Sequence, residues 1–307
     1  MNYKQNIEEL VNNFEGSISL YAVDEHKNEI RINENNIVES ASCIKTFILV
    51  EYYNQIMNSK KTRDDIMIYN KNDYVTNGSG ILQFLEEGVK LTSKNMAILM
   101  IILSDNIATN KMIEYLGFDN INQTIKKLGF NNTELSIEKL DFLLYNSVGR
   151  TTAYEYAKIY QLLLNKEILT PDLCNEIIEI LSHQTLNTML TKKLPLKDLD
   201  EKGTENAFIK YIASKSGSLG DIENKNMVNC RNDGGIISTS IGNYIISIFI
   251  NNCIDYYYYE DEKSITIGTQ FKIGNHILIA PNFRIIDFND GNEPNKYMAY
   301  INCSFNL

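Results

Sequence analysis

The chain has 307 residues, of which 44% are hydrophobic, and a formal net charge of -10 at pH 7. This length and apolar content suffice for one large domain or two interleaved ones with a core. The acidic charge is spread along the chain without a block of basic residues, which argues against nucleic acid as a partner. The longest uninterrupted apolar run, residues 97–103, is far below the roughly 20 residues that cross a bilayer, so no membrane span is expected.

The five cysteines lie far apart in the sequence, without a C-x-x-C pair or a nearby group of histidines. Neither a zinc site nor a disulfide framework is therefore predicted, and no cofactor is expected. The first five residues are polar and lack the apolar core of a signal peptide. We expect a chain that is either cytoplasmic or exported and already freed of its signal, and the sequence does not distinguish the two.

The N-terminal part of the chain has the residue pattern of a helix followed by that of two strands. Residues 5–14 have the apolar spacing of a short amphipathic helix, and residues 17–33 alternate with period two around a polar turn, as in an antiparallel hairpin. A polar stretch then leads to an apolar run at residues 46–53, which predicts a long helix. Ser42 lies at the N-terminus of this helix, where free N–H groups favour developing negative charge.

From this point to about residue 190 the pattern is helical. Caps and glycines delimit further helices over residues 94–103, 107–116, 120–128, 152–164 and 171–181. Period-two alternation returns after residue 205 and predicts strands over residues 208–213, 227–237 and 244–251. Residues 261–277 are compatible with a closing helix packed on the sheet, and residues 297–305 alternate like a strand.

Strands at both ends of the chain with helices between them predict an α/β fold of the α+β type. We expect an antiparallel sheet flanked by helices, with an inserted all-helical subdomain. Residues 1–40 and 200–280 would form the sheet-containing subdomain, and residues 41–199 the helical one. Residues 281–307 are a C-terminal extension whose placement the sequence leaves open.

Three short motifs stand in order along this framework. Ser42 and Lys45 form a Ser-x-x-Lys pair on one helix face, so the amine can approach the hydroxyl. A Ser-Asp-Asn motif at residues 104–106 follows an apolar helix, and Lys-Ser-Gly-Ser at residues 215–218 ends a strand. Each alone has a structural alternative, namely a helix cap with a solvated lysine, a cap for the next helix, and an ordinary edge-strand lysine.

The ordered triple resembles the serine penicillin-recognising enzymes, and especially the class A β-lactamases, whose motifs are S-x-x-K, S-D-N and K-[TS]-G. The resemblance covers residues 10–275 and leaves out the C-terminal tail. It implies the β-lactamase/transpeptidase-like fold and acyl-enzyme chemistry on a small-molecule substrate, a β-lactam or related amide.

The resemblance implies four catalytic residues. Ser42 is the nucleophile, and Lys45 is the base that takes its proton, which a lysine can do only if burial or nearby cations lower its pKa. Ser104 bridges the two lysines and relays a proton to the leaving nitrogen. Lys215 helps to lower the pKa of Lys45 and binds a substrate carboxylate.

The same resemblance implies the substrate-binding residues. Asn106 holds the amide side chain of the substrate, while Ser216 and Gly217 shape the strand edge along which the substrate lies. The backbone N–H groups of Ser42 and Ser218 form the oxyanion hole. Asp105 is expected to order the loop rather than to react.

The sequence departs from the class A pattern at two positions. The E-x-x-L-N motif, whose glutamate positions the deacylating water, is missing, and alignment offers Glu138 in its place, with Asp141 second. The same segment is also compatible with a short surface helix. Gly234 stands where many members carry an arginine for the substrate carboxylate, and Arg231 lies three residues earlier.

We therefore hypothesise a monomeric serine β-lactamase-like hydrolase that penicillins acylate and that deacylates slowly, because the loop motif is missing. One alternative is a D-alanyl-D-alanine carboxypeptidase or another amide or ester hydrolase. Another is a penicillin-binding sensor domain without turnover.

Overall fold

The computed structural model of the protein describes residues 16–76, 78–142, 147–186, 189–190, 194, 208–220 and 229–251, and the backbone of four strands after residue 262. The helix expected over residues 5–14 lies outside these residues. Within the described part of the chain, no helix has the length and apolar character needed to cross a membrane.

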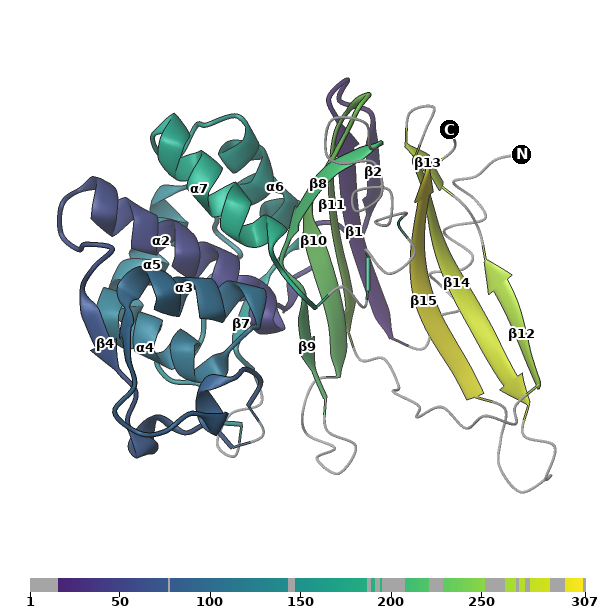
Figure 1. Cartoon of the computed structure of the whole chain (residues 1–307). Helices are drawn as coiled ribbons and strands as arrows, with labels where there is room; N and C mark the ends of the chain where they lie inside the picture. The colour runs from purple at the N-terminus through teal and green to yellow at the C-terminus, as the bar shows by residue number, and fades with distance from the viewer. Residues whose placement is uncertain are drawn as a thin grey trace.

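Strands from before and after the helical segment form one antiparallel sheet, as the predicted fold class requires. Its strands are β1 (Ser17–Asp24), β2 (Glu29–Ile32), β8 (Ile209–Ser214), β9 (Gly217–Leu219), β10 (Cys230–Thr239) and β11 (Gly242–Asn251). Their order is β2-β1-β11-β10-β8, and β9 also pairs with β10. The strand at one chain end therefore pairs with the strand at the other, since β1 lies beside β11 (Figure 1).

Alternating side chains of these strands enter two separate cores. On β1, Tyr21 and Val23 belong to the main core that the sheet shares with the helices, whereas Leu20 and Ala22 belong to a second core on the opposite face. Successive side chains of a strand point to opposite faces of the sheet, so a strand that is buried on both faces contributes to a core on each side.

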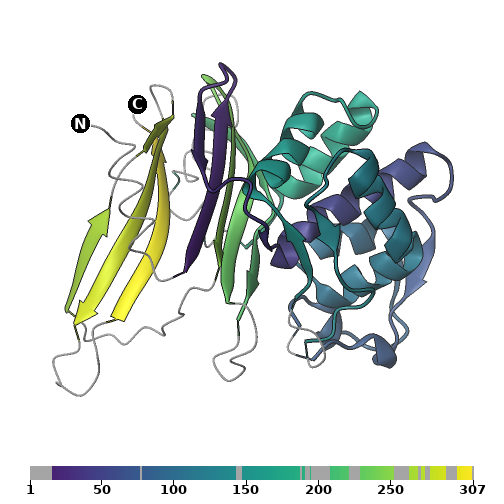
Figure 2. The ribbon, with the colours of Figure 1, turned by 180° about the vertical axis from the view of Figure 1, so that it is seen from behind.

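The helices cover one face of this sheet (Figures 1 and 2). They are α2 (Lys45–Met57), α3 (Ser93–Ile102), α4 (Asn106–Leu116), α5 (Phe118–Lys127), α6 (Ala153–Leu164) and α7 (Pro171–Ser182). Hydroxyl or carboxylate side chains cap the N-termini of four of them, at Thr92, Asp105, Thr152 and Thr170. The helices α3 to α7 lie within about two residues of their predicted limits, and α2 extends four residues beyond the apolar run at residues 46–53.

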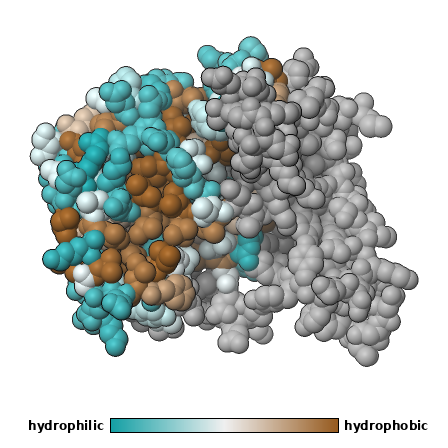
Figure 3. Space-filling view, viewed as in Figure 1, coloured by the Kyte–Doolittle hydropathy of each residue, from teal (hydrophilic) through white to brown (hydrophobic). Residues whose placement is uncertain are grey.

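Short elements frame the helical part. A three-stranded sheet contains β3 (Val38–Glu39), β6 (Glu134–Leu135) and β7 (Gly149–Thr151), and β4 (Ile66–Ile68) pairs with β5 (Lys90–Thr92). The 3₁₀ turns are η1 (Ala41–Ile44), η2 (Lys71–Asp73) and η3 (Leu82–Phe84). Apolar side chains gather on the face of the helical part that Figure 3 shows.

The prediction of a closing helix over residues 261–277 is wrong. This segment contains β12 (Lys263–Gly268) and β13 (Phe271–Ile273), which join β14 (Ile277–Asp287) and β15 (Lys296–Phe305) in a second antiparallel sheet. The sequence of β12 alternates polar residues with isoleucine, a β-branched residue that favours strands. The strand expected over residues 297–305 is confirmed by β15. Figures 1 and 2 show this sheet on the side of the first sheet away from the helices.

Candidate active site

Ser42 lies in the 3₁₀ turn η1, directly before α2. The preceding residue, Ala41, has a φ of +47°, in the left-handed region that L-residues with a Cβ rarely adopt. Strand β9 passes over this turn, and a Cβ added to Gly217 would lie 2.7 Å from the backbone N of Ser42. Glycine at this position therefore lets the strand edge approach the nucleophile candidate.

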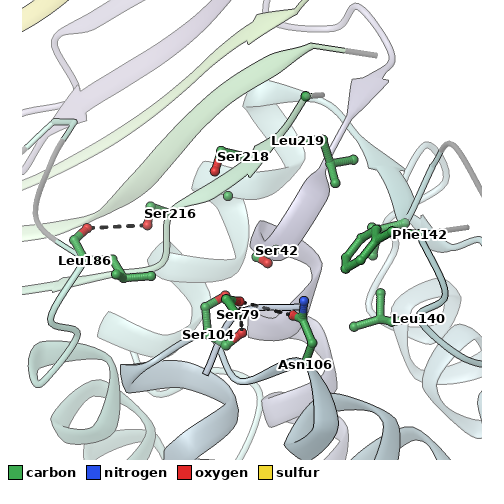
Figure 4. Close-up of a pocket in the computed structure, with 13 residues that line it drawn as sticks. Ser42, Ser79, Ser104, Asn106, Leu140, Phe142, Leu186, Ser216, Ser218 and Leu219 are labelled. Carbon is green, nitrogen blue, oxygen red and sulfur yellow. Dashed lines mark hydrogen bonds between the residues drawn. The ribbon is translucent and has the colours of Figure 1, made fainter. Parts of the chain in front are cut away.

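Residues of all three motifs line one cavity of about 450 Å³ (Figure 4). Its hydroxyl groups come from the serines at positions 42, 79, 104, 216 and 218. Across from Ser216 it is lined by apolar residues, which are Leu140 and Phe142 of the loop that follows β6 and Leu219 at the end of β9 (Figure 4). The cavity thus has a polar side formed by the motifs and an apolar side that they do not predict.

Lys45 is fully buried beneath this cavity. Its Nζ donates to the backbone O of Ser104 at 2.8 Å and to Oδ1 of Asn106 at 2.8 Å, and it lies 3.0 Å from Ser104 Oγ. Burial, followed by the nearby charge of Lys215, lowers the pKa of Lys45 well below its usual value, while Asp105 opposes this shift. The surroundings therefore favour the neutral amine, whose lone pair can accept a proton.

Lys215 is also fully buried, and burial lowers its pKa to about 8. Its Nζ donates to Oε1 of Gln184 at 3.2 Å and to the backbone O of Ser216 at 2.6 Å. Among the described hydrogen bonds, Ser104 is joined to Lys45 whereas Lys215 is joined to Gln184 and Ser216. The bridge between the two lysines through Ser104 is thus present here on the Lys45 side alone.

Gln184 is a site residue that the sequence did not indicate. Its Oε1 accepts from Lys215 Nζ and from the N–H of Ser216 at 2.9 Å, and its Nε2 donates to Ser214 Oγ at 3.1 Å. It follows α7 and is buried. A glutamine after a helix end is ordinarily a surface residue, so no local signal distinguishes this one.

Asp105 orders the loop between α3 and α4, as expected. Its Oδ1 accepts from the N–H of Ala108 at 2.9 Å, which caps α4, and its Oδ2 accepts from the N–H of Leu82 at 2.9 Å. Ser79 closes the same loop by donating to the backbone O of Ser104 at 2.7 Å. Asp105 therefore fixes Ser104 and Asn106 on either side of it in relation to the cavity wall.

The two carboxylates suggested for the deacylation step lie outside the lining of the cavity. Glu138 is exposed and Asp141 is half-buried, and neither is among the residues that line it. Leu140, which lies between them in the sequence, is buried and does line it. The loop therefore presents an apolar residue to the cavity.

The second departure has a steric cause. A Cβ on Gly234 would lie 2.8 Å from the backbone O of Ile246 and 2.9 Å from the ring of Tyr156, so an arginine does not fit there without movement. Arg231 is paired with Ser218 across β10 and β9, and its Nη1 donates to the backbone O of Leu219 at 3.1 Å. Arg231 therefore supports the strand edge from which the cavity is lined.

In the described ranges, no group of three or more His, Cys, Asp or Glu side chains is arranged to hold a metal ion. A model of the beta-lactamase enzyme family matches residues 2–273 of the chain. A comparison with curated protein sequences finds no match.

Solved structures share the fold of this chain. The β-lactamase from Sphaerobacter thermophilus superposes with a TM-score of 0.71 at 24% identity, over 83% of this chain and 91% of that one. A mutant of PBP-A, solved as an acyl-enzyme complex with penicillin-G, has a TM-score of 0.69 at 23% identity, over 82% of this chain and 88% of that one. An ancestral class A β-lactamase has a TM-score of 0.69 at 18% identity, over 83% and 93%.

These similarities show the β-lactamase/transpeptidase fold, with its sheet and inserted helical part. The family match extends over most of the chain, including all three motifs. The chain belongs to the beta-lactamase enzyme family.

Proposed function

We propose that the protein is a serine hydrolase that β-lactams or related amides acylate at Ser42, and that releases the acyl group slowly. The observation that carries this proposal is the burial of the Lys45 amine and its hydrogen bonds to residues of the second motif. This amine is fully buried with a lowered pKa, and it is bonded to Ser104 and Asn106 below the cavity that Ser42 lines. A buried amine whose pKa is lowered gives up its proton more easily, and in its neutral form it can activate a serine.

In the proposed reaction Lys45 takes the hydroxyl proton of Ser42, and Ser42 Oγ forms a bond to the carbonyl carbon of the substrate. The backbone N–H groups of Ser42 and Ser218 stabilise the oxyanion, and each such donor is typically worth about 10²–10³ in rate. As the C–N bond breaks, Ser104 gives its hydroxyl proton to the leaving nitrogen and receives in return the proton that Lys45 took from Ser42, so both Lys45 and Ser104 end the step in their starting forms. The product of this step is an ester between Ser42 and the acyl group.

The two sides of the cavity suggest how the substrate lies. Asn106 and the strand edge from Ser216 to Ser218 supply polar groups for its amides, and the charge of Lys215 attracts a carboxylate. Leu140, Phe142 and Leu219 supply an apolar surface for the side chain of the acyl group. Penicillin-G, which carries an aromatic acyl side chain and a carboxylate, is therefore a suitable probe.

Slow release is proposed because the loop side of the cavity is apolar. Hydrolysis of the ester needs a water molecule that is oriented and deprotonated by a base. The side chains of Leu140 and Phe142 do neither. The similarity to the PBP-A mutant that was solved as an acyl-enzyme complex with penicillin-G supports an acylated state of this site.

The test is a comparison of two substrates, a chromogenic cephalosporin and a peptide ending in D-alanyl-D-alanine. We expect one rapid equivalent of product from the cephalosporin, followed by slow turnover. Rapid cleavage of the peptide without useful cephalosporin hydrolysis would favour a D-alanyl-D-alanine carboxypeptidase. One equivalent from the cephalosporin with no turnover of either substrate would favour a sensor, and no reaction with either would contradict the proposal.

A further inference from the structure

Glu39 is a buried acidic residue on β3 that belongs to none of the three motifs. Burial raises the pKa of its carboxyl group, and the hydrogen bonds that it accepts oppose this shift. A buried carboxylate is costly unless its oxygens are satisfied. Its Oε2 accepts from Ser147 Oγ, and its Oε1 accepts from the backbone N–H groups of Ala41 at 2.8 Å, Val148 at 3.1 Å and Gly149 at 3.4 Å.

The backbone of Glu39 is fastened to the six-stranded sheet. Its N–H donates to Oδ1 of Asn251 on β11 at 2.8 Å, and its carbonyl accepts from Nδ2 of Asn232 on β10 at 2.8 Å. The Nδ2 of Asn251 also donates to Oδ1 of Asn232 at 3.2 Å, so the two amides form one buried unit. Glu39 therefore connects the sheet to the segments that its carboxylate holds.

Those segments form two parts of the active site. Ala41 directly precedes Ser42, and its N–H bond to Glu39 holds the backbone in the left-handed conformation that an alanine rarely adopts. Val148 lines the cavity, as Leu140 and Phe142 do. Since both amides bind the same carboxylate oxygen, the side chain of Glu39 sets the spacing between the turn of Ser42 and the wall at Val148.

We infer that Glu39 is a positioning residue for acylation, which places Ser42 and its backbone N–H relative to the cavity wall. The inference rests on the proposed acylation of Ser42. Reacting groups must be aligned closely, and a displacement of about 1 Å can cost about 10²-fold in rate. Glu39 supplies the fixed point because its own backbone is bonded to two strands of the sheet.

Two substitutions separate the reach of this side chain from its charge. Glu39→Asp keeps the charge but shortens the side chain by a methylene, so the carboxylate cannot hold the Ala41 and Val148 amides together. Glu39→Gln keeps the reach, because its amide oxygen can accept from the same N–H groups while its NH₂ donates to Ser147. The rate constant for acylation by penicillin-G and the dissociation constant of the initial complex are measured for each by stopped flow.

We expect Glu39→Asp to lower the acylation rate constant by about 10- to 100-fold, with the dissociation constant changed by less than about threefold. We expect Glu39→Gln to restore the rate constant to within about fivefold of the original protein, because the reach is kept. If Glu39→Asp does not fold, Ser147→Ala frees the second carboxylate oxygen and is expected to slow acylation by about fivefold. An unchanged acylation rate constant in the folded variant would overturn the inference.

Glu155→Asp is the matched control. Glu155 is also a buried carboxylate that holds a loop, accepting from the N–H of Asn132 at 3.1 Å and from Thr133 Oγ at 2.6 Å, but it lies on α6 and does not line the cavity. We expect it to lower the melting temperature and to leave the acylation rate constant unchanged. If Glu155→Asp and Glu39→Asp lower the acylation rate constant equally, Glu39 only stabilises the fold and the inference is wrong. Absence of acylation in the unsubstituted protein would contradict the proposed function instead.

Discussion

Asn110 on α4 holds both backbone hydrogen-bonding groups of Leu140. Its Nδ2 donates to the carbonyl of Leu140 at 3.1 Å, and its Oδ1 accepts from the N–H of Leu140 at 2.7 Å. Both bonds are buried, and Leu140 lines the cavity beside Ser42 (Figure 4). The backbone thus fixes where this side chain lies, and the residue type decides what chemistry it can perform there.

Leu140→Glu should therefore shorten the lifetime of the acylated protein. A carboxylate held at this position can orient and deprotonate a water molecule next to the ester, and general base catalysis typically contributes about 10²–10⁴ in rate. We expect the penicillin-G adduct to decay at least about tenfold faster, followed by intact-mass measurement over time. Leu140→Gln has nearly the same shape without the base, and equal decay of the two adducts would contradict this role.

The sequence predicted the features that depend on local signals. The Thr92 cap and the apolar run after it locate α3, and the period-two alternation of residues 17–33 locates β1 and β2. Residues of all three motifs line one cavity, and each motif lies at the end of a recognisable helix or strand, the first at the start of α2. The spacing of residues along the chain is therefore sufficient to predict these helices, strands and motifs.

The sequence did not predict contacts between distant residues. Leu140 lies in the cavity because Asn110, in another element, binds its backbone, whereas Glu138, which alignment with the class A motif offers, is exposed. Gln184 is part of the site only because β8 and α7 meet there. The helix prediction over residues 261–277 is wrong because it passed over the short alternation of serine, isoleucine and threonine in β12, which is typical of a strand.

Lys45→Met tests the proposed base. Methionine has a similar length and no proton acceptor of comparable strength, so Ser42 would lose its activation. We expect acylation by penicillin-G to slow by about 10²–10⁴-fold. Urea unfolding checks that the variant is folded, and a folded Lys45→Met protein that acylates at the original rate would exclude this role for Lys45.

Gln184→Glu tests the charge of Lys215 through pH. The pKa of Lys215 is lowered to about 8 by burial, so its positive charge is present below this pH and is lost as the pH rises through it. Acylation by the anionic penicillin-G should accordingly decline above pH 8. A carboxylate at residue 184 would contact Lys215 and favour its charged form, so we expect the decline to move up by about one pH unit. The measurement is the second-order acylation rate constant from pH 6 to 10, and superimposable profiles would contradict the assignment.

The most direct measurement is the intact mass of the protein after incubation with penicillin-G, followed by peptide mapping. We expect the mass to increase by that of one penicillin-G molecule, the adduct to map to Ser42, and the adduct to persist after free penicillin is removed. Ser42→Ala, which leaves the rest of the cavity in place, should show no increase. An unmodified mass with both penicillin-G and a chromogenic cephalosporin, or an adduct that still forms in Ser42→Ala, would show that Ser42 is not the acylated nucleophile.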